Sequence, residues 1–198
     1  MNKKALSETD IRTKFITPAI AEKWDVMTQV REEVFFTAGQ VIVRGKTVSR
    51  GTSKKADYIL YHKPNQPLAI VEAKDNNHPV GGGMQQALEY AEILDVPFVY
   101  SSNGDAFLEH DRTKKSGVVT REIPLDKFPS PEELWARYSG AKGYTPEQEI
   151  VATWDYFQND SRKPPRYYQT IAINRTVETL FGFFGILVAK RPRVPVAA

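Results

Sequence analysis

The fold is decided by the stretch KKADYILYHKPNQPLAIVEAK, which runs from Lys54 to Lys74. Two apolar runs, Lys54–Tyr61 and Leu68–Lys74, flank a polar segment, His62–Pro67, that contains two prolines. Short runs that are rich in aliphatic and aromatic residues and bounded by turn residues are typical of β-strands. The second run is apolar along nearly its whole length, as expected of a central strand covered on both faces. The sequence therefore predicts two strands that pair around a prolyl turn.

The predicted hairpin brings two acidic residues together. If the turn is centred on the Pro64–Asn65 bond, opposed residues have an index sum of 129, and Asp57 and Glu72 have this sum. Their Cβ atoms would lie about 5 Å apart, whereas a register slip of one residue would move Asp57 to the opposite face. Lys74 follows Glu72 by two residues and shares its face. Ala73 points away, which leaves its backbone carbonyl near the two carboxylates.

This constellation predicts a metal-dependent phosphodiesterase. Two carboxylates and a carbonyl form a hard oxygen site suited to Mg²⁺ that keeps waters and a substrate phosphate. Lys74 beside such a cation could orient or deprotonate a water for attack on phosphorus. It is also the only lysine in the sequence with an acidic residue two positions before it. The alternative is a cross-strand ion pair on a solvated face, worth at most about 1 kcal/mol, and the spacing leaves it open.

A helix predicted over Met84–Leu94, after Gly81–Gly83, adds polar candidates. Gln86 and Tyr90 are four residues apart and therefore share a helix face. Because this helix follows the strand that carries Glu72, its first turn should lie near the site. Gln86 could hydrogen-bond a phosphate or the catalytic lysine, and Tyr90 could stack on or hydrogen-bond a nucleic-acid strand. An ordinary amphipathic helix with a polar surface explains the same residues.

Other charged residues extend the candidate site. A basic run precedes Asp57 and could neutralise phosphates independently of sequence, although a solvated strand pair explains any single member equally well. Its members are Arg44, Lys46, Arg50, Lys54 and Lys55. Glu8 is a possible extra acid, and favourable interaction with a helix N-terminus accounts for it as well. His62, His78 and His110 show no metal-ligand spacing.

The remaining sequence predicts a mixed α/β fold. An N-terminal helix capped near Ser7, with an apolar face up to Trp24, should be kinked or divided at Pro18. A strand over Val96–Ser102, reached through the Met84–Leu94 helix, implies a right-handed crossover and parallel pairing. The other predicted elements are a strand–turn–strand over 40–48, a strand over 106–110, and helices over 131–138, 146–157 and 166–180.

Composition excludes several classes of protein. The 198-residue chain has no cysteine, which rules out disulfide scaffolds, Cys-ligated zinc, iron–sulfur clusters and thiol chemistry. Its first residues lack the apolar core of a secretory signal, and the longest apolar stretch, Phe181–Ala189, is too short to cross a bilayer. We therefore expect a soluble cytoplasmic protein with no membrane partner. The net charge of +3 permits a polyanionic partner without requiring one.

Taken in order, these motifs resemble the N-terminal part of the restriction (R) subunit of type I restriction–modification enzymes, over most of residues 5–178. The acid–acid-x-Lys pattern alone is degenerate, and the ordered set of segments is much more specific. The segments are Ser7–Arg12, Phe15–Ile20, Trp24, Lys55–Tyr61, Ile70–Lys74, Gln85–Ala91, Pro97–Gly104 and Arg166–Gln169.

The resemblance implies a restriction-endonuclease-like PD-(D/E)xK core, with a central mixed sheet flanked by helices. Asp57, Glu72 and Lys74 would be its catalytic residues, and Gln86 and Tyr90 its glutamine–tyrosine element. The implied cofactor is Mg²⁺ and the implied substrate is double-stranded DNA. The implied partners are the methyltransferase and specificity subunits of the restriction complex. In this family the nuclease precedes an ATP-driven translocase, so ATP would be bound only by the full-length subunit.

The resemblance also assigns Gln169 to a glutamine motif that contacts adenine at the start of the first motor domain. The chain departs from the family in two respects: it has no G-x-x-x-x-G-K-[ST] phosphate loop, and after about Leu180 it no longer follows the pattern. We therefore expect a fragment that does not translocate DNA by itself. The predicted division is a nuclease domain over 5–139, a linker and truncated motor start over 140–180, and a divergent tail over 181–198.

Two other functions are compatible with the sequence. One is a stand-alone structure-specific nuclease of the same fold, which would cut branched DNA without other subunits. The other is a non-catalytic module for DNA binding or for assembly of a methyltransferase complex. Metal binding that disappears when Glu72 is replaced would separate the nucleases from the assembly module.

Overall fold

The computed structural model describes residues 2–37, 41–44, 47–50, 53–155 and 165–189, with the backbone alone for 41–44, 47–50 and 182–189. The chain divides into two compact units, Met1–Gly143 and Tyr144–Ala198. The first unit carries the predicted hairpin and the second carries the last two helices.

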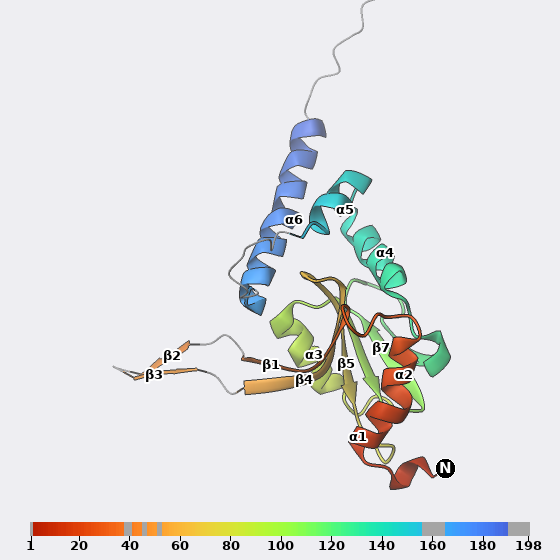
Figure 1. Cartoon of the computed structure of the whole chain (residues 1–198). Coiled ribbons are helices and arrows are strands. Elements are labelled where there is room, and N and C mark those ends of the chain that lie inside the picture. The colour runs from red at the N-terminus through yellow and green to blue at the C-terminus, as the bar shows by residue number, and fades with distance from the viewer. Residues whose placement is uncertain (1, 38–40, 45–46, 51–52, 156–164, 190–198) are drawn as a thin grey trace, which may run out of the picture. The chain divides into compact units, whose positions relative to one another are not determined.

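A six-stranded mixed sheet with the order β1-β4-β5-β6-β7-β8 forms the centre of the first unit (Figure 1). Its strands are β1 (Val30–Thr37), β4 (Ser53–Lys63), β5 (Gln66–Ala73), β6 (Phe98–Ser102), β7 (Ala106–Asp111) and β8 (Thr120–Pro124). Neighbouring strands are antiparallel except β5 and β6, which are parallel. Parallel neighbours need a crossover connection, and helix α3 (Met84–Leu94) supplies it with the predicted bounds. The predicted mixed α/β fold is confirmed.

Strand β5 is covered on both faces, as its apolar sequence predicts. Every residue from Leu68 to Ala73 is buried. Helix α3 packs on β5 and β6. On the other face, helix α2 (Thr17–Ala21) contacts β4, where Thr17 Oγ1 lies 2.8 Å from the hydroxyl of Tyr58. The core of the unit therefore lies on both sides of the β4–β5 hairpin.

The N-terminal helical region is divided into segments around Pro18. Ser7 and Asp10 form a capping box at α1 (Glu8–Ile11), which leads into a π-helical turn, η2 (Arg12–Ile16), and then into α2. Pro18 lies in the first turn of α2. A proline inside a continuous α-helix would lack its backbone hydrogen bond and collide with the carbonyl four residues earlier. The wider π turn, followed by a new helix, removes this conflict, so the predicted interruption is confirmed.

The predicted strand–turn–strand after β1 forms a separate two-stranded antiparallel sheet. It consists of β2 (Val41–Arg44) and β3 (Thr47–Arg50), in which Arg44 pairs with Thr47 and Val41 with Arg50. Gly45, which was expected to form its turn, lies outside the described residues, as do Gln40 and Lys46, which were expected to belong to its strands.

Two strands of the main sheet were not predicted. They are the edge strands β1 and β8, and both carry several consecutive polar residues: Arg31-Glu32-Glu33 in β1 and Thr120-Arg121-Glu122 in β8. Edge strands are commonly rich in charge, which discourages pairing with other chains. This charge obscures the alternation on which strand prediction depends.

Three helices differ in length from the prediction. Helix α4 (Pro131–Lys142) continues past Tyr138 to Gly143, whose φ of 68° supplies a left-handed cap. In the second unit, α5 (Pro146–Ala152) is shorter than expected, and the predicted end at Phe157 lies outside the described residues. Helix α6 (Tyr167–Ala189) passes Leu180 because no proline occurs before Pro192. Among the described helices, none is both long enough and apolar enough to cross a bilayer.

The contact between α3 and the hairpin gives a stability prediction. A Cβ atom at Gly83, the residue that caps α3, would lie 3.0 Å from Glu72 Cβ and 3.1 Å from Ser101 Oγ. We expect Gly83→Ala to lower the free energy of unfolding by about 1–3 kcal/mol because of this overpacking. In α4, a Cβ at Gly140 would meet nothing within 4 Å, so Gly140→Ala should raise stability by up to about 1 kcal/mol. Urea unfolding measures both, and equal stability of the two variants would contradict the tight seating of α3.

Candidate active site

The β4–β5 hairpin has the predicted register. Tyr58 pairs with Val71 and Ile59 with Ile70, which gives the index sum of 129. The next position along the ladder places Asp57 opposite Glu72, although irregularities occur nearer the turn, around Tyr61. The regular pairs from Leu60–Ala69 to Tyr58–Val71 set this register, and antiparallel geometry continues it to the acidic residues.

Two hydrogen bonds join the acidic residues to the opposite strand. The backbone N–H of Ala73 donates to Asp57 Oδ2 at 2.9 Å, and the backbone N–H of Asp57 donates to Glu72 Oε1 at 3.2 Å. A backbone N–H group of each strand therefore holds the carboxylate of the other strand in place. Both side chains are almost completely buried, with residue exposures of 7% for Asp57 and 1% for Glu72.

Burial makes Glu72 a weak acid. Its pKa is raised to about 8, first because burial penalises the charged carboxylate and second because of the nearby negative charge of Asp57. At neutral pH, Glu72 in the metal-free protein therefore carries a proton for most of the time. A bound cation would supply the opposite charge that the pair lacks.

Lys74 lies at the end of the same strand. Its backbone N–H donates to Ser102 O, so it follows the edge of β6 beyond the last residue of β5. Its ammonium group is 3.5 Å from Gln86 Oε1 and 4.0 Å from Glu8 Oε2. Glu8 of α1 therefore lies next to Lys74, although the two residues are far apart in the sequence.

Helix α3 provides a polar bridge between the acidic pair and the lysine. Gln86 Nε2 donates to Glu72 Oε2 at 2.8 Å and lies 3.2 Å from the Tyr90 hydroxyl. The same amide presents its oxygen to Lys74. The ring of Tyr90 is buried and packs edge-on against Phe36, with 5.1 Å between centroids. This ring is not available for the stacking on nucleic acid considered from the sequence, and only its hydroxyl faces the polar cluster.

Two of the predicted basic residues, Lys54 and Lys55, form ion pairs. Lys54 Nζ is 3.1 Å from Glu89 Oε2 and also lies over the ring of Tyr90. Lys55 Nζ is 3.3 Å from Glu33 Oε1. Arg44 and Arg50 belong to β2 and β3, for which the backbone is described, and Lys46 lies outside the described residues.

Sequence reasoning missed the role of Arg12. Its Nη1 lies 3.7 Å from Asp57 Oδ1 and donates to Glu33 Oε1 at 3.0 Å, while Nη2 lies 3.4 Å from Glu32 Oε2. A signal was present, since Arg12 follows Glu8 by four residues in a capped helix and therefore shares its side of the helix. The contact with Asp57, however, depends on tertiary packing.

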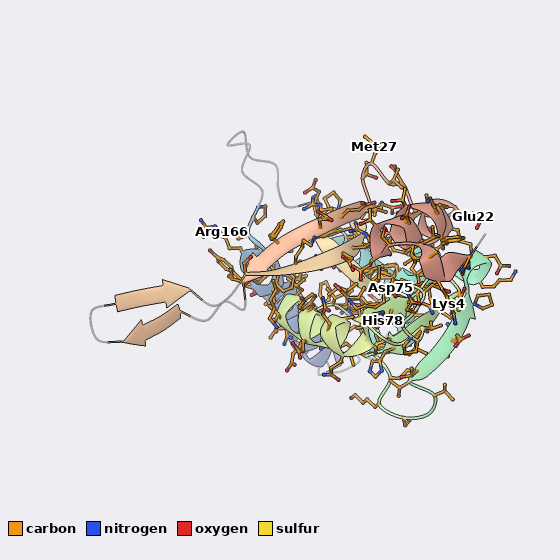
Figure 2. The ribbon with its side chains drawn as sticks, turned by 90° about the horizontal axis from the view of Figure 1, so that it is seen from below. Lys4, Glu22, Met27, Asp75, His78 and Arg166 are labelled. Carbon is orange, nitrogen blue, oxygen red and sulfur yellow. The ribbon has the colours of Figure 1, made fainter. Side chains whose placement is uncertain are left out.

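The three histidines, which show no metal-ligand spacing in the sequence, have partners outside the acidic pair. Asp75 and His78, labelled in Figure 2, belong to the loop before α3, and His78 Nδ1 is 3.0 Å from Asp75 Oδ1. His110 lies 2.9 Å from the Thr120 hydroxyl, and His62 stacks on Trp135. Within the described parts of the chain, no group of three or more His, Cys, Asp or Glu side chains is arranged to hold a metal. The candidate metal site is therefore the two-carboxylate pair with the carbonyl of Ala73.

Gln169 belongs to the second unit. Its side-chain oxygen accepts a hydrogen bond of 2.9 Å from the backbone N–H of Arg166, at the beginning of α6. This contact satisfies one of the free N–H groups near a helix start. The adenine contact remains a prediction, as does the division into a nuclease domain, a truncated motor start and a tail.

Known proteins similar to the chain agree with this architecture. The family model for the type I restriction enzyme R protein N terminus matches residues 25–124. The EcoAI type I restriction enzyme endonuclease subunit of Escherichia coli is 52% identical over 182 residues, which are 91% of this chain and 22% of that subunit. A solved fragment assigned to an HsdR subunit of a type I restriction enzyme from Vibrio vulnificus has a TM-score of 0.73 and 40% identity, covering 88% of this chain and 32% of that one. The resemblance inferred from the sequence is thereby confirmed, and the chain belongs to the family of type I restriction enzyme R protein N termini.

Proposed function

We propose that this chain is a Mg²⁺-dependent endonuclease domain that hydrolyses phosphodiesters of double-stranded DNA. The observation that carries the proposal is the reciprocal hydrogen bonding of Asp57 and Glu72 across the hairpin, next to Lys74 and Gln86. Family membership supports the same conclusion, because the related Escherichia coli protein is named as an endonuclease subunit.

The residues of the site fit a magnesium ion. Mg²⁺ in enzymes is usually held by one or two carboxylates and completes its shell with waters and substrate phosphate. Asp57 and Glu72 supply the two carboxylates, and the carbonyl of Ala73 is the third candidate ligand. The pKa of Glu72 is raised first by burial and second by the charge of Asp57, and a bound cation would favour its ionised form.

The residues of this chain have separate tasks in the proposed reaction. Bound Mg²⁺ supplies stabilisation of negative charge on the phosphate and helps to generate the nucleophile. Lys74 would orient the attacking water as an ammonium group, or take its proton in the neutral amine form. Gln86 holds Glu72 through its amide N–H group and Lys74 through its amide oxygen, so that the acid and the amine keep a fixed relation. Glu8 lies close enough to Lys74 to serve as an additional acid or to hold the ammonium in place.

DNA would be bound chiefly through its backbone. Lys54 and Lys55 already carry carboxylate partners, which phosphates would have to replace. We also assign Arg44 of β2 and Arg50 of β3 to this proposed contact with DNA. Neutralising phosphates in this way makes affinity sensitive to salt and insensitive to sequence.

We further propose that the domain works inside a larger enzyme. Cleavage would be coupled to an ATP-driven translocase, to which Gln169 would contribute the adenine contact. The methyltransferase and specificity subunits would choose the DNA site, and the complex would act in the cytoplasm. The chain spans 22% of the length of the Escherichia coli subunit, so these activities belong to the longer subunit and its complex.

Cleavage in the reconstituted complex tests the function. We expect Lys74→Ala to abolish Mg²⁺-dependent cutting of plasmid DNA in the presence of the remaining subunits, because no group replaces the amine at the attacking water. General acid–base groups contribute about 10²–10⁴-fold to rate. The matched control is Lys127→Ala, which removes an exposed lysine from the short helix η3 (Leu125–Lys127) and should cut normally. Undiminished cutting by a folded Lys74→Ala variant would refute the proposal, and efficient cutting of branched DNA by this chain alone would favour the stand-alone nuclease.

Metal binding should release a proton. Because the pKa of Glu72 is about 8 in the empty site, roughly nine tenths of it is protonated at pH 7, and a metal ligand must be deprotonated. Calorimetric titration with Mg²⁺ or Mn²⁺ in two buffers of different ionisation enthalpy should therefore show nearly one proton released per ion. The apparent affinity should rise about tenfold per pH unit below pH 8 and level off above it. Glu72→Gln should remove the release together with the binding, and binding that is independent of pH would contradict this account.

A further inference from the structure

Arg12 is held beside the candidate metal ligands by two acidic side chains. Arg12 is the first residue of the π-helical turn η2, and its side chain is only 11% exposed. It lies over the ring of Tyr58, 5.2 Å from its centroid, and contacts Glu32 and Glu33 of β1. Its remaining charged neighbour is Asp57. A planar guanidinium can serve several carboxylates at once because its donors diverge in one plane.

The two carboxylate oxygens of Asp57 have different partners. Oδ2 accepts the hydrogen bond from the backbone of Ala73, whereas Oδ1 lies 3.7 Å from Arg12 Nη1. The two contacts hold the carboxylate from different sides, so that it cannot turn without losing one of them. Glu72, the other acid of the site, is held by a backbone N–H and by the Gln86 amide.

The backbone of β1 is adapted to this contact. Glu33 has a φ of 51°, a left-handed conformation that is unfavourable for a residue with a side chain. It occupies the position between the pairs Glu32–Tyr58 and Val34–Ala56, which is the position opposite Asp57. Strained backbone at a defined position persists only where surrounding interactions maintain it. Here the contact between Glu33 and Arg12 is such an interaction.

We propose that Arg12 is a positioning residue for the metal-binding carboxylate of Asp57, held in place by Glu32 and Glu33. The inference rests on the proposed function, since it concerns the same metal site. Arg12 touches neither substrate nor metal in this role. It fixes the carboxylate that would ligate the ion, and the two acids of β1 offset its positive charge so that it does not repel the ion.

This balance of charge determines the design of the test. Arg12→Met alone would leave Glu32 and Glu33 facing Asp57, and the added negative field would attract cations nonspecifically. The double variant Arg12→Met/Glu33→Gln removes one positive and one negative group together, so the local net charge is unchanged. The matched control is Arg31→Met, because Arg31 also lies over a tyrosine of β4, Tyr61.

Calorimetric titration of the chain with Mn²⁺ measures the effect. Residues that orient a metal ligand typically contribute about 10–100-fold to metal affinity. We expect the double variant to bind Mn²⁺ at least about tenfold more weakly than the wild type and Arg31→Met to bind it normally. Arg12→Lys should recover only part of the affinity, because it keeps the charge but loses the diverging donors. The amide of Ala73, which donates to Asp57, should exchange its hydrogen faster in the double variant and unchanged in Arg31→Met.

The outcomes separate this inference from the proposed function. If the wild type binds Mn²⁺ and Glu72→Gln does not, unaltered or tighter binding by a folded double variant overturns the positioning role alone. If the wild type binds no Mn²⁺, both proposals fall. If the double variant does not fold, Arg12→Lys is compared with Arg31→Lys, since both keep the positive charge but only Arg12 lies beside Asp57. A loss of affinity confined to Arg12→Lys supports the role, and equal affinities overturn it.

Discussion

The structure of the candidate site depends on the register of the β4–β5 hairpin. In this register the backbone N–H groups of Asp57 and Ala73 each serve a carboxylate of the opposite strand. A shift of one residue would turn Asp57 to the opposite face of the sheet, and no adjustment of side chains could restore the pair. The irregularity near Tyr61 stays close to the turn, and the regular pairing resumes at Leu60. The turn can therefore vary without disturbing the acidic end.

The acidic pair is unfavourable for the folded protein and useful for the proposed chemistry. Burying Glu72 beside Asp57 raises its pKa, so the folded protein disfavours ionisation of this carboxyl group. Such a cost persists only where neighbouring groups maintain the arrangement. Those groups come from both sides of the sheet: Gln86 from α3 on one side and Arg12 from the N-terminal helices on the other.

Sequence reasoning succeeded where local geometry fixes the outcome. The index sum around a short turn places Asp57 opposite Glu72, and helical spacing places Gln86 and Tyr90 together. It failed where a contact depends on how elements pack. The burial of the Tyr90 ring follows from its packing on Phe36 of β1, an edge strand that was not recognised because its charged residues interrupt the alternation. The approach of Arg12 to Asp57 could not be predicted either, because it depends on how the N-terminal helices pack on the sheet.

The location of the site follows from the parallel pairing of β5 and β6. Because these strands run in the same direction, Glu72 and Ser101 stand side by side near their carboxyl ends, where the chain leaves the sheet and the first turn of α3 returns to it. Gly83 permits this close return, since its backbone N–H donates to Ser101 Oγ while a side chain there would collide with Glu72. This close return brings Gln86 of α3 within hydrogen-bonding distance of Glu72, although the acidic pair itself stays buried. The crossover that parallel pairing requires therefore also supplies the polar partner of the buried acid.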